Sequence, residues 1–193
     1  ARLDAAFSGV EIRELRDKGT KVKEKLEAFE ARYGDSLLIR EYPAQSVTVP
    51  MLRAHIMQLR LKGFNPDVII VDYINLLGRA EKTDSYRGLG DVYIALRGLM
   101  QEFNVWGITA AQSHRSRFNS ELITMKDIAE SFEGAMHSDT IITLNETDAE
   151  HQKGRMRLYL AKNRNEVSGR IIPIQTDFAR GSFYTRRKVK VKQ

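Results

Sequence analysis

Apolar residues along this chain occur either in short continuous runs or at the spacing of a helix. Val68 to Val71 form a continuous run, which is typical of a strand covered by helices on both faces. A helical spacing follows at residues 89–103, and a second apolar run, Val105 to Ala111, comes after it. This order predicts two parallel strands joined by a helix, and therefore an α/β fold.

The remaining segments repeat the two patterns. Apolar spacing predicts helices at residues 21–33 and 48–62, the second with Thr48 as N-cap and Pro50 in its first turn. Further elements are predicted as a short strand at residues 37–40, a helix at 125–136 and strands at 140–144, 155–160, 170–175 and 182–185. The last three strands predict an antiparallel C-terminal margin on a mostly parallel central sheet with helices on both faces.

A single acid, Asp72, ends the first apolar run. Open α/β sheets bind their ligands at the carboxyl ends of the strands. A carboxylate there can hold the Mg²⁺ of a bound nucleoside triphosphate, directly or through water. The run by itself fits equally well with a core strand that happens to end in an aspartate.

Gln112 stands at the corresponding point after the second run. A right-handed crossover brings the ends of both strands to one edge of the sheet, so Asp72 and Gln112 are expected to face one phosphate. The acid would serve the metal ion. The glutamine amide can donate a hydrogen bond to a γ-phosphate oxygen and so report whether that group is present.

Lys162 and Arg164 follow a segment in which polar and apolar residues alternate. Alternate residues leave a strand on the same side, so both cations can point at one anion. The simpler interpretation is a pair of surface charges, and this spacing makes it harder to accept here than elsewhere in the chain.

Composition narrows the class of protein. The chain has 193 residues, with 42% hydrophobic and 29% charged residues, which fits one soluble globular domain. The absence of cysteine excludes disulfides and thiolate metal sites, and the four histidines show no metal-binding spacing. No apolar run of 18 residues and no signal peptide are present, which predicts no contact with a membrane.

A formal net charge of +6 favours an anionic partner. Much of the excess lies in the tail at residues 186–193, which we interpret as a solvated end rather than a nucleic-acid arm. Residues 1–185 are expected to form one partial domain.

Four segments carry a resemblance to a known family: VIIVDYINLL, AAQSHR, FEGAMHSDTIITL and LAKNRNEVSGRI. In this order and spacing they resemble the C-terminal ATPase domain of DnaB-type replicative DNA helicases of bacteria or phages. The first 16 residues, ARLDAAFSGVEIRELR, are similar to the helical stretch after the second strand of that domain. The resemblance implies a RecA-like P-loop NTPase core.

The same resemblance assigns roles residue by residue. Asp72 matches the magnesium-associated acid and Gln112 matches the γ-phosphate sensor. Lys162 and Arg164 match the basic pair that such helicases place against the nucleotide of a neighbouring subunit. ATP and Mg²⁺ are the implied cofactors, and the implied partners are single-stranded DNA, further copies of the chain in a hexameric ring, and a primase or helicase loader. The implied location is the cytoplasm of a bacterium or of a phage-infected host.

Single-stranded DNA is expected on the two loops that follow the nucleotide-facing strands, at residues 79–88 and 113–120. A shift of Asp72 or Gln112 can be transmitted to these loops, whereas the basic tail has no such link. The cations expected to contact phosphates are Arg79, Lys82, Arg87, Arg115 and Arg117.

One motif of the family does not occur in this sequence. A phosphate-cradling loop requires Gly-x-x-x-x-Gly-Lys-Ser/Thr, and none of the 13 glycines is followed by lysine. The resemblance places that loop before the point matched by Ala1, so we expect a truncated, inactive domain or a homologue without the loop. Two alternatives stay open: another RecA-like ATPase, such as a recombinase or clock-type ring protein, and a nonenzymatic DNA-binding or loader module.

Overall fold

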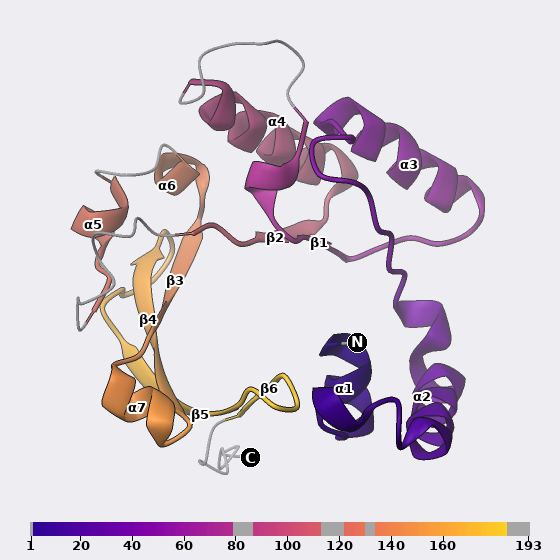
Figure 1. Cartoon of the computed structure of the whole chain (residues 1–193). Coiled ribbons are helices and arrows are strands. Elements are labelled where there is room, and N and C mark those ends of the chain that lie inside the picture. Colours follow the sequence, from indigo (N-terminus) through magenta and orange to yellow (C-terminus); the bar gives the residue numbers. More distant parts are fainter. Residues whose placement is uncertain (1, 79–86, 113–121, 130–133, 185–193) are drawn as a thin grey trace, which may run out of the picture. The chain divides into compact units, whose positions relative to one another are not determined.

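The computed structural model describes residues 2–78, 87–112, 122–129 and 134–184 (Figure 1). Contacts within the chain separate two compact units. The first comprises Ala1–Leu37, Ser116–Asp127 and Asp139–Gln193, and the second comprises Leu38–Arg115 and Ile128–Ser138. In the described part of the chain, no helix is long and apolar enough to cross a membrane.

The second unit is built around a parallel pair of strands, β1 (Val68–Val71) and β2 (Trp106–Thr109). The register runs from Val68 opposite Trp106 to Val71 opposite Thr109. α3 (Val49–Leu61) precedes β1, and α4 (Arg87–Phe103) connects the two strands (Figure 1). The predicted order of strand, helix and parallel strand is therefore confirmed.

The core of this unit lies between α3, α4 and one face of the parallel pair. Four apolar residues at helical spacing on α4 are buried, namely Val92, Leu96, Leu99 and Phe103. Ile69 and Val71 of β1 pack against this cluster. α3 begins after Thr48, as predicted, although the Thr48 side chain makes no capping hydrogen bond. The helix ends before Gly63, whose φ of +88° favours glycine.

The other face of the parallel pair is exposed. Val68 and Ile70 on β1 have exposed fractions of 46% and 69%, and Trp106 and Ile108 on β2 have 78% and 54%. The prediction that β1 is covered on both faces is therefore wrong for the described residues, as is the placement of Trp106 in the core. An apolar run shows that both faces of a strand are suited to burial, but it does not show what covers them.

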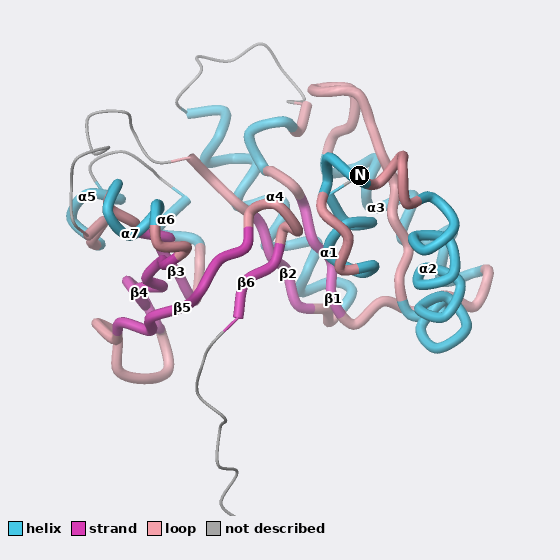
Figure 2. Tube along the Cα trace, turned by 60° about the horizontal axis from the view of Figure 1, so that its bottom comes forward, coloured by secondary structure: helices cyan, strands magenta, loops and turns pink. Residues whose placement is uncertain are grey.

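The first unit contains an antiparallel sheet in the order β3-β4-β5-β6 (Figure 2). Its strands are β3 (Thr140–Asn145), β4 (Arg155–Asn163), β5 (Ile171–Asp177) and β6 (Ser182–Tyr184). The predicted antiparallel margin is confirmed. The prediction of a mostly parallel sheet is wrong for the described strands, because β3 pairs antiparallel with β4. Strand propensity alone does not select the partner or its direction.

The helices of the first unit are α1 (Arg2–Ser8), η1 (Ile12–Glu14), α2 (Gly19–Tyr33), η2 (Gly34–Ser36) and α7 (Asp148–Gln152). Phe7 of α1 stacks on Phe29 of α2 with ring centroids 4.2 Å apart. α2 confirms the helix predicted at residues 21–33. α7 was not predicted, although its capping box of Thr147 and Glu150 is readable in the sequence.

Two further predictions differ from the structure. Residues 37–40 form no strand, and the side chains of Leu37, Leu38 and Ile39 are exposed. The helix predicted at residues 125–136 is seen as α5 (Met125–Ala129) and α6 (Gly134–His137), with residues 130–133 outside the described part.

Arg180 ties the segment after α1 to the turn between β5 and β6. Its guanidinium donates to Asp177 Oδ2 at 2.6 Å, to Glu11 Oε1 at 3.0 Å and to the Gly9 carbonyl at 3.1 Å. The hydrogen bond from Arg180 lowers the pKa of the Asp177 carboxyl. Segments distant in sequence are therefore joined through one guanidinium.

We expect Asp177→Asn to lower the melting temperature of the chain at pH 7. A carboxyl whose pKa is depressed in the folded state stabilises that state above its unfolded pKa, and this contribution disappears as the pH falls through the folded pKa. The deficit of the variant should therefore shrink below about pH 4. Thermal melts between pH 7 and pH 3 measure it, with Asp17→Asn at an exposed site as control. A deficit that stays constant with pH would contradict this account.

Candidate functional site

Asp72 lies directly beyond the last paired residue of β1. Val71 is the final residue in register with β2, so the acid stands at the carboxyl edge of the parallel pair. Its side chain is exposed, and the peptide bond between Asp72 and Tyr73 is cis. The predicted position at a strand end is confirmed, and the carboxylate is accessible to a ligand.

Thr109, the last residue of β2, holds the chain on both sides of Asp72. Its hydroxyl donates to the Val71 carbonyl at 2.9 Å and accepts the Ile74 N–H at 3.1 Å. The backbone that carries the acid is therefore fixed to the neighbouring strand. The sequence analysis gave Thr109 no role. The available signal was a hydroxyl residue at the end of a strand expected to lie beside the acid.

The chain leaving Asp72 is anchored as far as Gly78. Ile74 in η3 (Ile74–Leu76) is fully buried, and the Gly78 N–H donates to the Val47 carbonyl at 2.7 Å. A Cβ at Gly78 would lie 2.7 Å from the Gln45 carbonyl oxygen, so glycine is required for this close approach. The predicted DNA loop at residues 79–88 thus starts from a fixed point.

Gln112 lies three residues beyond the end of β2, and its side chain is exposed. Because β1 and β2 are parallel neighbours, Asp72 and Gln112 leave the same edge of the sheet. The structure therefore brings the two segments to one edge.

Lys162 and Arg164 belong to the first unit. Lys162 lies on β4 and is half-buried, whereas Arg164 follows the strand and has a 51% exposed side chain. Arg164 is paired with Asp139, at 2.7 Å between Nη1 and Oδ1. The two predicted pairs of site residues thus lie in different units.

The predicted DNA contacts fall mostly outside the described residues. This holds for Arg79, Lys82, Arg115 and Arg117, whereas Arg87 begins α4 but its side chain is not among those described. Their role stays a prediction.

The part of the chain that the structure describes holds no group of three or more His, Asp or Glu side chains suited to a metal ion. Mg²⁺ at nucleotide sites does not require such a group, because it is bound by one or two carboxylates together with phosphates and water. Asp72, as an exposed carboxylate at the ligand-binding edge, fits that limited role.

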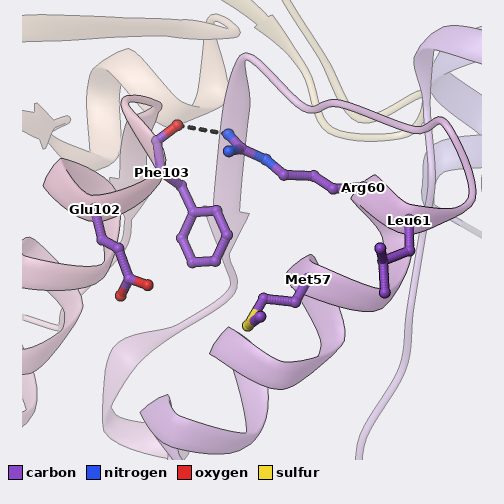
Figure 3. Close-up of a pocket in the computed structure, with 5 residues that line it drawn as sticks. All are labelled: Met57, Arg60, Leu61, Glu102 and Phe103. Atoms are coloured by element: carbon purple, nitrogen blue, oxygen red, sulfur yellow. Dashed lines mark hydrogen bonds between the residues drawn. The ribbon is translucent and has the colours of Figure 1, made fainter.

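A pocket of about 420 Å³ lies between the C-terminal ends of α3 and α4 and is lined by Met57, Arg60, Leu61, Glu102 and Phe103 (Figure 3). Arg60 donates to the Phe103 carbonyl at 2.5 Å, and its guanidinium lies 4.7 Å from the centre of the Phe103 ring. Both helix ends lead into the amino ends of the strands. The pocket is therefore at the edge opposite Asp72.

We expect Thr109→Val to destabilise the fold by roughly 1–3 kcal/mol, because it leaves the Val71 carbonyl and the Ile74 N–H without their partner. Thr109→Ser keeps the hydroxyl and serves as the matched control. Denaturant unfolding measures the free energy, and hydrogen exchange at the Ile74 amide measures the local effect. Equal unfolding energies and equal exchange rates for both variants would rule out a tether through the hydroxyl.

Comparisons with known proteins agree on one family. Over 156 residues the chain is 28% identical to a DnaB-like replicative helicase of Enterobacteria phage T4, covering 76% of this chain but only 33% of that protein. Two solved structures share the fold at 18% identity and cover 96% of this chain. An ATPase domain has a TM-score of 0.80 with 69% of its chain covered. A DnaB-like replicative helicase, described with its interactions with primase, has a TM-score of 0.78 with 47% covered.

The chain therefore spans about a third of the length of its phage T4 relative. Residues 1–181, nearly the whole chain, match the model of the DnaB-like helicase C-terminal domain. This protein belongs to the DnaB-like helicase C-terminal domain family.

Proposed function

We propose that this chain is the C-terminal part of the motor domain of a ring-forming replicative helicase, which couples ATP hydrolysis to the unwinding of DNA. The observation that carries the proposal is the parallel register of β1 and β2, which puts Asp72 and Gln112 at one edge. Membership of the helicase family favours this function over a recombinase or a clock-type ring protein. ATP turnover by the intact protein would separate it from a nonenzymatic loader.

Within the proposed RecA-like core, Asp72 supports Mg²⁺ from the end of β1, directly or through water. The ion supplies charge neutralisation on the β- and γ-phosphates. The Gln112 amide donates to a γ-phosphate oxygen and loses this acceptor after hydrolysis. The sequence has no Gly-x-x-x-x-Gly-Lys-Ser/Thr loop, so the main phosphate cradle must come from residues outside these 193.

Arg164 and Lys162 complete the site from a neighbouring copy in a hexameric ring, with single-stranded DNA in the ring and a primase or loader as further partners. Arg164 is the better candidate for the transition state, because its half-exposed guanidinium is accessible from outside its own unit. Lys162, two residues earlier on β4, adds a second positive charge.

In the intact ring, we expect Arg164→Ala to spare ATP binding but to slow hydrolysis by roughly 10³- to 10⁵-fold, as for other arginines that act in trans. Arg13→Ala, at another exposed arginine that forms an ion pair, is the control. Steady-state turnover and nucleotide affinity are measured on the same preparations.

Mixed rings then test the geometry. In a ring of Arg164→Ala and Asp72→Asn subunits, one of the two kinds of mixed interface has both an intact acid and an intact arginine. Such rings should regain turnover. Failure to complement at every mixing ratio would refute action in trans.

Two loops are proposed to hold single-stranded DNA through Arg79, Lys82, Arg87, Arg115 and Arg117. What supports them is their attachment: one follows Gly78, which is anchored behind Asp72, and the other follows Gln112. Movement at the nucleotide therefore has a short route to the DNA.

Replacing both Arg115 and Arg117 by alanine should weaken DNA binding and flatten the salt dependence by about 0.7 per lost phosphate contact. Deletion of residues 186–193 is the comparison and should leave DNA-stimulated ATPase in place. The assignment fails if the deletion abolishes stimulation while the double variant keeps both its affinity and its salt slope.

A further inference from the structure

Asp139 contacts Arg164 through both its backbone and its side chain. The Arg164 N–H donates to the Asp139 carbonyl at 2.9 Å, and Nη1 lies 2.7 Å from Oδ1. Asp139 comes directly before β3 and Arg164 directly after β4. The contact extends the antiparallel ladder by one step beyond the pair of Thr140 and Asn163.

A β-bulge precedes this contact. Ile141 is in register with Lys162, but Ile142 is in register with Leu160, so Ala161 has no partner in the ladder. A bulge bends its strand and changes the direction of the side chains that follow. Lys162 and Arg164 are the cations that follow. Their direction is therefore set locally and not by the regular alternation of β4.

The ion pair contributes little to stability by its position. The side chains of Arg164 and Asp139 are 51% and 53% exposed, and ion pairs with this exposure are worth about 0–1 kcal/mol. What the pair does fix is the direction of the guanidinium, since it restrains a long side chain that otherwise samples many rotamers. A guanidinium has five N–H donors, so a contact at Nη1 is compatible with a phosphate on another edge.

Resting on the proposed action of Arg164 in trans, we propose that Asp139 is a positioning residue that orients the Arg164 guanidinium toward the nucleotide of the neighbouring subunit. Preorganised charge stabilises a transition state without a cost of reorientation during the reaction. Removal of Asp139 therefore affects hydrolysis through Arg164 and leaves ATP binding in place.

The experiment measures kcat and KM for ATP in intact rings with Asp139→Ala, Asp139→Asn, Arg164→Ala and the double variant Asp139→Ala with Arg164→Ala. Asp139→Ala should lower kcat by roughly 10- to 100-fold, the scale of a misplaced catalytic group, with KM unchanged. Asp139→Asn keeps an acceptor oxygen and should lose less. Glu27→Gln, at an exposed acid paired with Lys23 on α2, is the control and should match the wild type.

The double variant decides whether Asp139 acts through Arg164. Once Arg164 is alanine, Asp139→Ala should cause no further loss of kcat, because there is no guanidinium left to orient. A further loss of the same size in that background, an unchanged kcat in the single variant, or a rise in KM without a fall in kcat would each overturn the proposal. If Arg164→Ala alone leaves turnover intact, the function proposed for Arg164 is wrong and the role of Asp139 is lost with it.

Discussion

The candidate site depends on the parallel pairing of β1 with β2. These strands are distant in sequence, and α4 between them supplies the buried residues that hold the pair to α3. Without this register, Asp72 and Gln112 would be two exposed polar residues at unrelated points. With it, both leave one edge of one sheet, and a ligand at that edge can meet a carboxylate and an amide together.

Much of the local structure was predictable because it follows from periodicity. α4 shows the helical spacing clearly, and the strands β4, β5 and β6 show alternation or high strand propensity. Periodicity reports which side of an element is apolar, and it carries no information on what covers that side. This is why the exposure of Trp106, the direction of β3 beside β4 and the lack of a strand at residues 37–40 were not predicted.

The site divides in the same way. Asp72 and Gln112 were found from the sequence because each stands where an apolar run ends, which is a local signal. Thr109 and Asp139 act across strands: Thr109 bonds to residues 35 and 38 positions away, and Asp139 meets a residue at the end of the neighbouring strand. Such partners become visible only once the pairing is known.

Both halves of the candidate site use the same device. Asp72 and Arg164 each stand one residue beyond the end of a strand, where the ladder no longer fixes the chain. In each case a side chain at the neighbouring strand supplies the missing restraint: the Thr109 hydroxyl holds the backbone around Asp72, and the Asp139 carboxylate holds the Arg164 guanidinium. A restraint from the side leaves the charged group exposed, whereas burial would fix it equally well but would remove it from the ligand. Groups held in this way can remain accessible and still be oriented before a nucleotide arrives.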